Sequence, residues 1–359
     1  MRGILCLEDG FFVEGELINE TLPLTGEVVF FTGMTGYEDA LTDPSYRGQI
    51  LVFSFPMLGN YGIPQCSGQS PKIQVRGIVT HDLWSGPVRD SWMTLNEVAK
   101  NNACPILTGV DTRRVVLHLR NHGAMKGIIS SLEDRDLSPG VIRKLSEEAA
   151  KFQMKRIAEE VSAKEVRILG NRDSSRGTCV LMDFGVKSDM LRTLLHMGLI
   201  IYVVPPDFPA EEVLSIRPDF VFLSNGPGDP EDNEESIQCV KALLGRVPVY
   251  GICLGHQILS LSAGARITKL KYGHHGANQP VKDFRTGRAF ITSQNHNFAV
   301  DDSSLPPHVA VTHRNLNDGT IEGIEIRSVR AASVQFHPEG APGPRDERFW
   351  AMLEESLGA

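Results

Sequence analysis

The chain has 359 residues, of which 41% are hydrophobic and 22% charged, and its formal net charge is -8. At about 100–200 residues per domain, this length predicts two domains, each able to bury a core of its own. The acidic balance, without any dense cluster of Lys and Arg, excludes a protein that binds nucleic acid through a basic surface.

The cysteines indicate a reducing environment. They stand at irregular spacing, as Cys6, Cys66, Cys104, Cys179, Cys239 and Cys253. No CxxC pair occurs, so neither a zinc ribbon nor a dithiol redox motif is predicted, and reduced thiols are the simplest expectation. No run approaches the ~18 apolar residues of a membrane span, and the first residues, MRGILCLEDG, turn acidic too early for a signal peptide. These features favour a cytoplasmic protein without membrane contact.

Residues 1–169 read as a mixed α/β domain that is rich in strands. Short β-rich runs bounded by glycine or proline recur there, such as GEVVFFTG, GQILVFSFP and IQVRGIVTHD. Residues 138–166 read as helical, with charges on one side. The polar, glycine-flanked stretch that follows predicts a linker at 170–177.

Residues 178–359 show a different pattern. Apolar strands alternate with helical runs from CVLMDFG, at 179–185, to VPVYGI, at 247–252. This alternation predicts βαβ units and a doubly wound, mostly parallel sheet with helices on both faces. Right-handed crossovers put the carboxyl ends of such strands at one edge of the sheet, where ligand sites lie. From residue 266 the chain is again rich in strands.

Cys253 stands between a buried-type strand and a helix, flanked by Gly251 and Gly255. This strand-to-helix turn has the pattern of a nucleophile elbow. A helix N-terminus stabilises a thiolate, and the N–H of Leu254 is placed to face a developing oxyanion. Gln257 lies one turn later on the same helix face, where it could hydrogen-bond a substrate. The alternative is a buried structural cysteine.

Two other motifs end predicted strands. SVQFHPEG offers His337 as a base and Glu339 as the group that orients it, although a surface turn is the alternative. LSNGPGDP, at 223–230, leaves the backbone N–H groups of Gly226 and Gly228 bare, so they could complete an oxyanion hole or hold a carboxylate. The alternative there is a plain turn.

Taken together, GICLGHQ, SNGPGDP and FHPE resemble the class I, triad-type glutamine amidotransferases, over roughly residues 178–350. The stretch GEVVFFTGMTGYEDALTDPSYRGQILVFSFPMLGNYG resembles the N-terminal domain of the small-subunit family of glutamine-dependent carbamoyl-phosphate synthases. GVDTRRVVLHLRNHGAMKG, DFGVKSDMLRTL and YGHHGANQPV are similar to the same family. The resemblance covers almost the whole chain.

The resemblance implies a catalytic triad, with Cys253 as nucleophile, His337 as base and Glu339 as orienting carboxylate. It also implies a set of glutamine contacts: Ser45, Gly226, Gly228, Leu254, Gln257, Asn295, Asn297 and Phe298. Asn297 stands where the family usually has glycine. Because asparagine tolerates a positive φ, we expect Asn297 to keep a glycine-like backbone conformation.

The function implied is glutamine hydrolysis through a Cys thioester. The ammonia would pass to a large subunit that makes carbamoyl phosphate from bicarbonate and two ATP, for arginine and pyrimidine biosynthesis. That partner would form a heterodimer with this chain, or a tetramer of heterodimers, and residues 1–169 would dock it. The chain has no GxxxxGK[ST] motif, so we expect ATP and magnesium on the large subunit and no cofactor here. A free-standing γ-glutamyl thiol hydrolase and a non-catalytic scaffold of the same fold remain alternatives.

The adjacent residues His274 and His275 are potential metal ligands. Adjacent side chains diverge, however, and no thiol or carboxylate cluster accompanies them in the sequence. We therefore predict no metal site in this chain.

Overall fold

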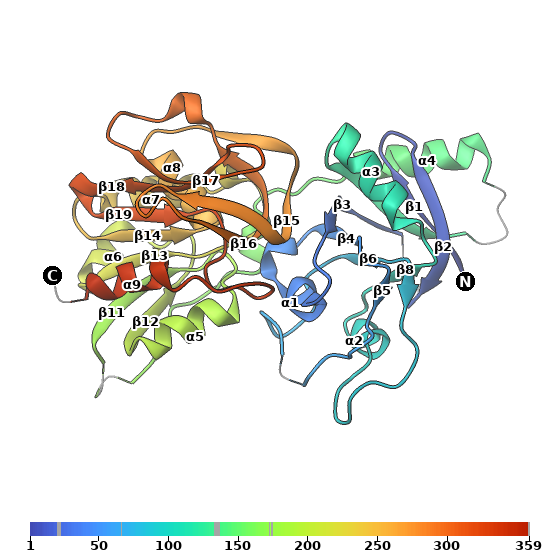
Figure 1. Ribbon diagram of the computed structural model, residues 1–359, viewed down its shortest axis with the longest axis horizontal. Helices are drawn as coiled ribbons and strands as arrows, with labels where there is room; N and C mark the ends of the chain where they lie inside the picture. The colour runs from blue at the N-terminus through green and yellow to red at the C-terminus, as the bar shows by residue number, and fades with distance from the viewer. Residues whose placement is uncertain (20–22, 66, 133–136, 172, 174, 358–359) are drawn as a thin grey trace. The chain divides into compact units, whose positions relative to one another are not determined.

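The computed structural model describes residues 1–19, 23–65, 67–132, 137–171, 173 and 175–357. The chain forms two compact units, Met1–Met154 and Lys155–Ala359 (Figure 1). This division comes earlier than the predicted linker at 170–177, because strand β10 (Arg167–Leu169) pairs with β12 (Leu199–Val204) of the second unit. Residues 172 and 174 of the predicted linker lie outside the described residues.

The first unit is built on a mixed sheet that closes on itself in the order β1-β2-β8-β6-β4-β3-β9. Its strands are β1 (Arg2–Leu7), β2 (Phe12–Ile18), β3 (Leu24–Phe31), β4 (Gln49–Phe53), β6 (Gly77–Val79), β8 (Ile106–Thr108) and β9 (Met125–Ser131). The other elements are α1 (Tyr37–Thr42), the 3-10 helix Pro44–Tyr46, the pair β5 (Met57–Leu58) and β7 (Asp82–Leu83), α2 (Leu95–Asn101), α3 (Thr112–His122) and α4 (Pro139–Ala150). The β-branched and aromatic runs become buried strands, which confirms the prediction of a mixed, strand-rich domain.

The predicted helix over residues 138–166 is wrong in its second half. Helix α4 ends at Ala150, and a 3-10 helix, Ile157–Glu160, follows. Arg156, between the two, has a φ of 48°, in the left-handed region that an α-helix cannot include. The periodic pattern of charged residues over 138–166 therefore continues from the first unit into the second.

The second unit contains a ten-stranded sheet in the order β10-β12-β11-β13-β14-β19-β18-β17-β15-β16. Its further strands are β11 (Gly177–Met182), β13 (Phe220–Leu223), β14 (Val249–Ile252), β15 (Ile267–Asp283), β16 (Ala289–Val300), β17 (Ala310–Asn315), β18 (Ile321–Ile326) and β19 (Ala331–Val334). Its helices are α5 (Ser188–His196), α6 (Ala210–Ser215), α7 (Glu234–Leu243), α8 (Leu254–Ser262) and α9 (Glu347–Glu355), with 3-10 helices Pro230–Asp232, Asp302–Ser304 and Arg327–Val329.

The strands β12, β11, β13, β14 and β19 pair in parallel and form the centre of this sheet. Alternate residues of β11 enter different cores, because side chains alternate across a strand. Val180 and Met182 pack with α6, α7 and α8, whereas Cys179 and Leu181 pack with α5 and α9. The predicted doubly wound sheet with helices on both faces is therefore confirmed (Figure 1).

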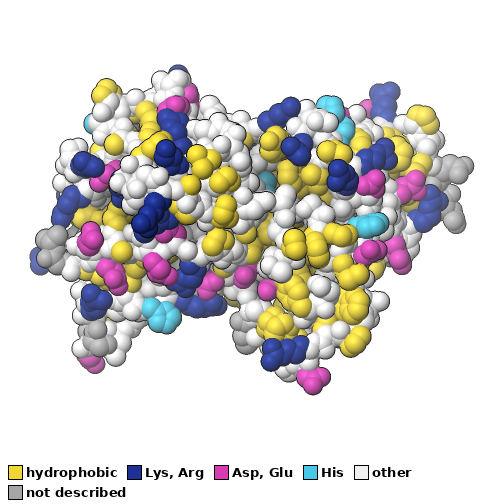
Figure 2. Space-filling view, viewed as in Figure 1, with side chains coloured by type: hydrophobic (Ala, Val, Ile, Leu, Met, Phe, Trp, Pro, Cys, Tyr) yellow, Lys and Arg dark blue, Asp and Glu magenta, His cyan; other side chains and the backbone are white. Residues whose placement is uncertain are grey.

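The distribution of surface charge and the state of the cysteines agree with what the amino-acid composition predicts. On the face shown in Figure 2, Lys and Arg side chains alternate with acidic and apolar ones, so that face has no continuous basic surface. Cys6, Cys104, Cys179, Cys239 and Cys253 are free thiols, whereas Cys66 lies outside the described residues. Within the described ranges, no helix combines the length and the apolar character needed to cross a membrane.

Candidate active site

Cys253 sits at the turn between the parallel strand β14 and helix α8, as the elbow motif predicts. Its φ of 55° and ψ of -107° are unusual for a residue with a side chain, and such conformations cluster at functional sites. The Cys253 N–H donates to the Val334 carbonyl at 2.9 Å, which ties the turn to β19. The residue is only 2% exposed.

The glycines around Cys253 are required by close contacts. A Cβ at Gly255 would lie 2.2 Å from the Leu223 carbonyl oxygen, and a Cβ at Gly251 would lie 2.6 Å from the Gly255 oxygen. Any side chain at these positions would push the first turn of α8 away from β13 and β14. The sequence reasoning that glycine permits this turn is therefore confirmed in the contacts.

His337 and Glu339 follow β19 and are buried beside Cys253. His337 Nδ1 lies 2.7 Å from Glu339 Oε1. The backbone N–H of His337 donates to the Ser293 carbonyl at 2.9 Å. Burial alone would lower the pKa of His337, but the Glu339 carboxylate and then the charge of Cys253 raise it to about 10. The structure thus brings the three predicted triad residues together, with Nε2 as the ring nitrogen that Glu339 does not use.

Lys187 is a member of this cluster that the sequence reasoning missed. Its Nζ lies 2.8 Å from Glu339 Oε1 and donates to the Gly340 carbonyl at 3.0 Å, and its side chain is 1% exposed. Burial alone would raise the pKa of Glu339, but Lys187 and then His337 lower it to about 2. Lys187 is the N-cap residue of α5, in the loop that follows β11, and no local sequence pattern marks it.

The glycine loop after β13 lies against the start of α8. A Cβ at Gly226 would lie 2.3 Å from the Phe184 carbonyl oxygen and 2.9 Å from Leu254 Cδ2. Gly228 has a φ of +95°. Leu254 is the first residue of α8, so its N–H has no acceptor within the helix. The structure therefore packs Gly226 against Leu254, while the role of these N–H groups in an oxyanion hole stays a prediction.

Strand β16 carries three of the predicted glutamine contacts. Cys253 Sγ lies 3.6 Å from the Asn295 carbonyl oxygen. Gln257 Nε2 donates to the Phe298 carbonyl at 3.0 Å and to Gln335 Oε1 at 3.0 Å, which fixes α8 to the strand.

The expectation of a positive φ at Asn297 is wrong. Asn297 lies inside β16 and is absent from the described non-glycine residues with positive φ. Antiparallel pairing with β15, including His275 opposite Asn295, keeps this part of β16 extended. The left-handed conformation occurs instead on the facing strand, at Gly273 with a φ of +69°.

Ser45 belongs to the first unit, in the 3-10 helix Pro44–Tyr46. Its N–H donates to Asp43 Oδ1 at 2.9 Å. Its contact with glutamine stays a prediction.

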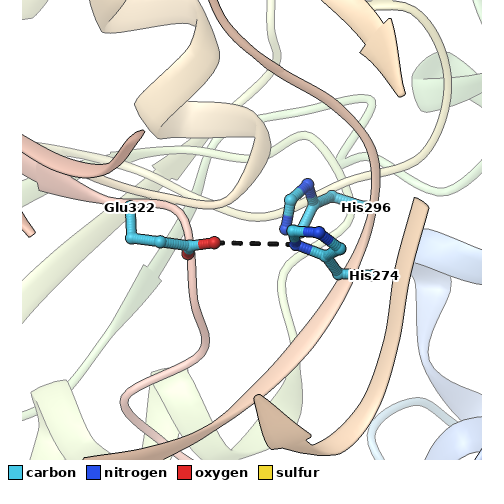
Figure 3. Close-up of side chains that lie close together, drawn as sticks. All are labelled: His274, His296 and Glu322. Atoms are coloured by element: carbon cyan, nitrogen blue, oxygen red, sulfur yellow. Dashed lines mark ion pairs between the residues drawn. The ribbon is translucent and has the colours of Figure 1, made fainter. Parts of the chain in front are cut away.

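His274, His296 and Glu322 form a buried cluster whose ligand-type atoms lie within 4.8 Å of one another, close enough for one metal ion (Figure 3). His274 Nε2 lies 2.8 Å from Asp318 Oδ2, while Nδ1 lies 2.8 Å from Gln294 Oε1 and 3.6 Å from Glu322 Oε1.

Burial alone would lower the pKa of His274, but the hydrogen bond to Asp318 and the ion pair with Glu322 raise it to about 9. An imidazolium has no lone pair for a metal, so these contacts favour a buried ionic network. The sequence reasoning that no carboxylate accompanies His274 is wrong, because Glu322 and Asp318 reach it from β18 and the preceding turn.

Comparison with known proteins covers both units. Residues 180–353 match the class-I glutamine amidotransferase family, and residues 5–129 match the CPSase domain of the carbamoyl-phosphate synthase small chain. The carbamoyl phosphate synthase small chain of Archaeoglobus fulgidus is 44% identical over 99% of both chains. That of Caldanaerobacter subterraneus subsp. tengcongensis is 45% identical over 96% of this chain and 93% of its own. That of Methanopyrus kandleri is 44% identical over 99% of this chain and 100% of its own. The chain therefore belongs to the carbamoyl phosphate synthase small chain family.

Proposed function

We propose that this chain is the glutamine-hydrolysing subunit of a glutamine-dependent carbamoyl-phosphate synthase. The observation that carries the proposal is the buried assembly of Cys253, His337 and Glu339 at a strand-to-helix elbow, in a chain of this family. A nucleophile, a base and a group that orients the base are the parts that acyl transfer through a thioester requires.

In the first half of the reaction, the Cys253 thiolate attacks the side-chain amide carbon of glutamine and forms a new S–C bond. The oxyanion accepts hydrogen bonds from the Leu254 N–H and from the loop of Gly226 and Gly228. The protonated imidazole of His337 gives its proton to the amide nitrogen as the C–N bond breaks, so ammonia leaves and a thioester remains.

In the second half, neutral His337 takes a proton from a water molecule that attacks the thioester. The S–C bond breaks, glutamate leaves, and Cys253 returns to the thiolate. Glu339 holds Nδ1 of the imidazole throughout, which fixes the tautomer that exchanges protons through Nε2. Lys187 keeps Glu339 ionised for this role.

The glutamine contacts that belong to this proposal are Ser45, Gly226, Gly228, Leu254, Gln257, Asn295, Asn297 and Phe298. The burial of Asn295 and the Cys253–Asn295 contact support the part of this set that lies on β16.

The ammonia would be delivered to a large synthetase chain. We place ATP, magnesium and bicarbonate on that partner, in a heterodimer or a tetramer of heterodimers that serves arginine and pyrimidine biosynthesis, and we place the docking surface on the first unit. The relatives' name, small chain, supports such a partner. This chain itself would need no cofactor.

The test is glutamate release from glutamine by the purified chain, before and after addition of the cognate large chain with ATP and bicarbonate. We expect a slow rate that rises sharply on addition and that Cys253→Ser abolishes. A rate that the large chain leaves unchanged would indicate an independent γ-glutamyl hydrolase. Absence of hydrolysis in the full complex would indicate a scaffold and would overturn the proposal.

A further inference from the structure

The two adjacent histidines of β15 point to opposite sides of the strand, as neighbours in an extended segment do. His274 turns to the ionic network of Asp318 and Glu322. His275 turns to β16, where its Nδ1 lies 2.9 Å from Asn295 Oδ1 and its Nε2 lies 2.8 Å from Asn297 Oδ1. One buried imidazole therefore bridges two asparagines that are separated by a single residue.

This bridge acts on the part of β16 that touches the nucleophile. The Asn295 carbonyl oxygen lies 3.6 Å from Cys253 Sγ, so a shift of Asn295 changes the surroundings of the thiol directly. His275, Asn295 and Asn297 are all buried, with exposed fractions of 3%, 8% and 7%. Because buried polar groups that lose a partner are costly, the bridge fixes the conformations of both amides.

Gly273 shows how tightly the bridge is enclosed. The pairing of β15 with β16 shifts register between Lys269 and His274, and Gly273 lies in this irregular stretch. A Cβ at Gly273 would lie 2.3 Å from Asn297 Oδ1 and 2.6 Å from His275 Nε2. A side chain at position 273 would therefore occupy the place of the hydrogen bond itself.

We propose that His275 is a positioning residue for glutamine hydrolysis, which holds Asn295 and Asn297 in the conformation that binds the substrate beside Cys253. The proposal rests on the proposed function. The proposal also explains why asparagine stands at position 297. The side-chain amide of Asn297 is the second hydrogen-bond partner of the His275 imidazole, and a glycine at this position could not supply it.

The hairpin offers a matched pair of glycines for the test. Gly273 and Gly287 have φ values of +69° and +70°, but nothing lies within 4 Å of a Cβ at Gly287. Alanine therefore adds similar backbone strain at both positions and disturbs the bridge at only one. In the complex with the large chain, we expect Gly273→Ala and His275→Gln to raise the KM for glutamine about ten- to hundredfold, the range of one or two buried hydrogen bonds, with a smaller change in kcat. Gly287→Ala should keep the wild-type KM.

A second readout does not depend on turnover. The pH profile of Cys253 alkylation by iodoacetamide, followed by peptide mass spectrometry, should shift in Gly273→Ala and His275→Gln and stay unchanged in Gly287→Ala. In an Asn297→Gly background, His275→Gln should raise KM less than it does in the wild type, because one of its two partners is already absent.

The proposal is overturned if folded Gly273→Ala and His275→Gln proteins keep the wild-type KM and alkylation profile, or if the effects of His275→Gln and Asn297→Gly are additive. If the wild-type complex does not hydrolyse glutamine, the proposed function fails instead, while the alkylation profiles still decide whether the bridge positions the strand beside Cys253.

Discussion

Replacing Lys187 by Met would leave the Glu339 carboxylate inside the protein without its cation. The two groups lie 2.8 Å apart and their side chains are 1% and 0% exposed, so water cannot substitute for the ammonium. Breaking a buried pair by removing one partner costs about 3–5 kcal/mol. In a unit of this size each kcal/mol lowers the melting midpoint by about 2–4 °C, so the midpoint should fall by roughly 6–20 °C.

The same change should move the pH dependence of activity. The pKa of Glu339 is lowered to about 2, so its ionised form adds stability above the ordinary value near 4.5, and this stability is lost as pH falls toward 2. Without Lys187 the pKa of Glu339 rises, and the carboxylate is protonated at a higher pH. A neutral carboxyl group no longer stabilises the His337 imidazolium, so the acid limb of glutamine hydrolysis should shift to higher pH.

The assay is glutamate release by the complex across pH 4 to 10, together with thermal unfolding of the chain. Lys241→Met is the matched control, because Lys241 is exposed on α7 and should change neither quantity. The reasoning is refuted if Lys187→Met keeps its acid limb in place and melts like the control.

Three further changes test other contacts. His274→Gln removes an imidazole whose pKa is raised to about 9. The stability that this imidazole adds is complete below its ordinary pKa near 6.5 and is lost as pH rises through 9. Denaturant unfolding of the variant should therefore show a loss of about 3 kcal/mol at pH 6 and a much smaller loss at pH 10. Gly255→Ala places a Cβ 2.2 Å from a backbone oxygen and should lower the melting midpoint strongly, whereas Gly140→Ala, whose nearest contact would be at 3.8 Å, should not. Cys253→Ser should remove glutamate release while leaving thermal unfolding near wild type, which separates its chemical role from its packing.

The parts of the fold that could be predicted are those with local signals. The alternation from β11 to α8 is visible because each apolar strand ends at a turn residue and each helix has its own period. The helix over 138–166 could not be bounded in this way. Its charged pattern continues past Ala150, although α4 ends there and Arg156, further on, has a left-handed conformation; the periodicity gives no signal for either.

The triad could be predicted for the same reason. Cys253 lies between two glycines, and His337 and Glu339 stand two residues apart, so each motif is complete within a few positions. Lys187 was missed because its partner Glu339 is far away in the sequence, and a lysine before a helix has no distinctive local pattern. The two residues meet only because β11 and β19 end at the same edge of the sheet.

The hairpin β15–β16 shows why a correct local rule led to an incomplete conclusion. Adjacent side chains on β15 do diverge, as the sequence reasoning held, but each histidine meets its own partners: His274 the carboxylates near β18, and His275 the asparagines of β16. The partners lie 20 to 48 positions further along the chain, and strand register alone decides which of them face each histidine. Because a one-residue slip would exchange the two sides, the irregular pairing around Gly273 controls both networks at once. A Cβ at Gly273 would lie 2.3 Å from Asn297 Oδ1 and 2.6 Å from His275 Nε2, so we expect Gly273→Ala to disturb this register and, through the proposed role of His275, glutamine binding.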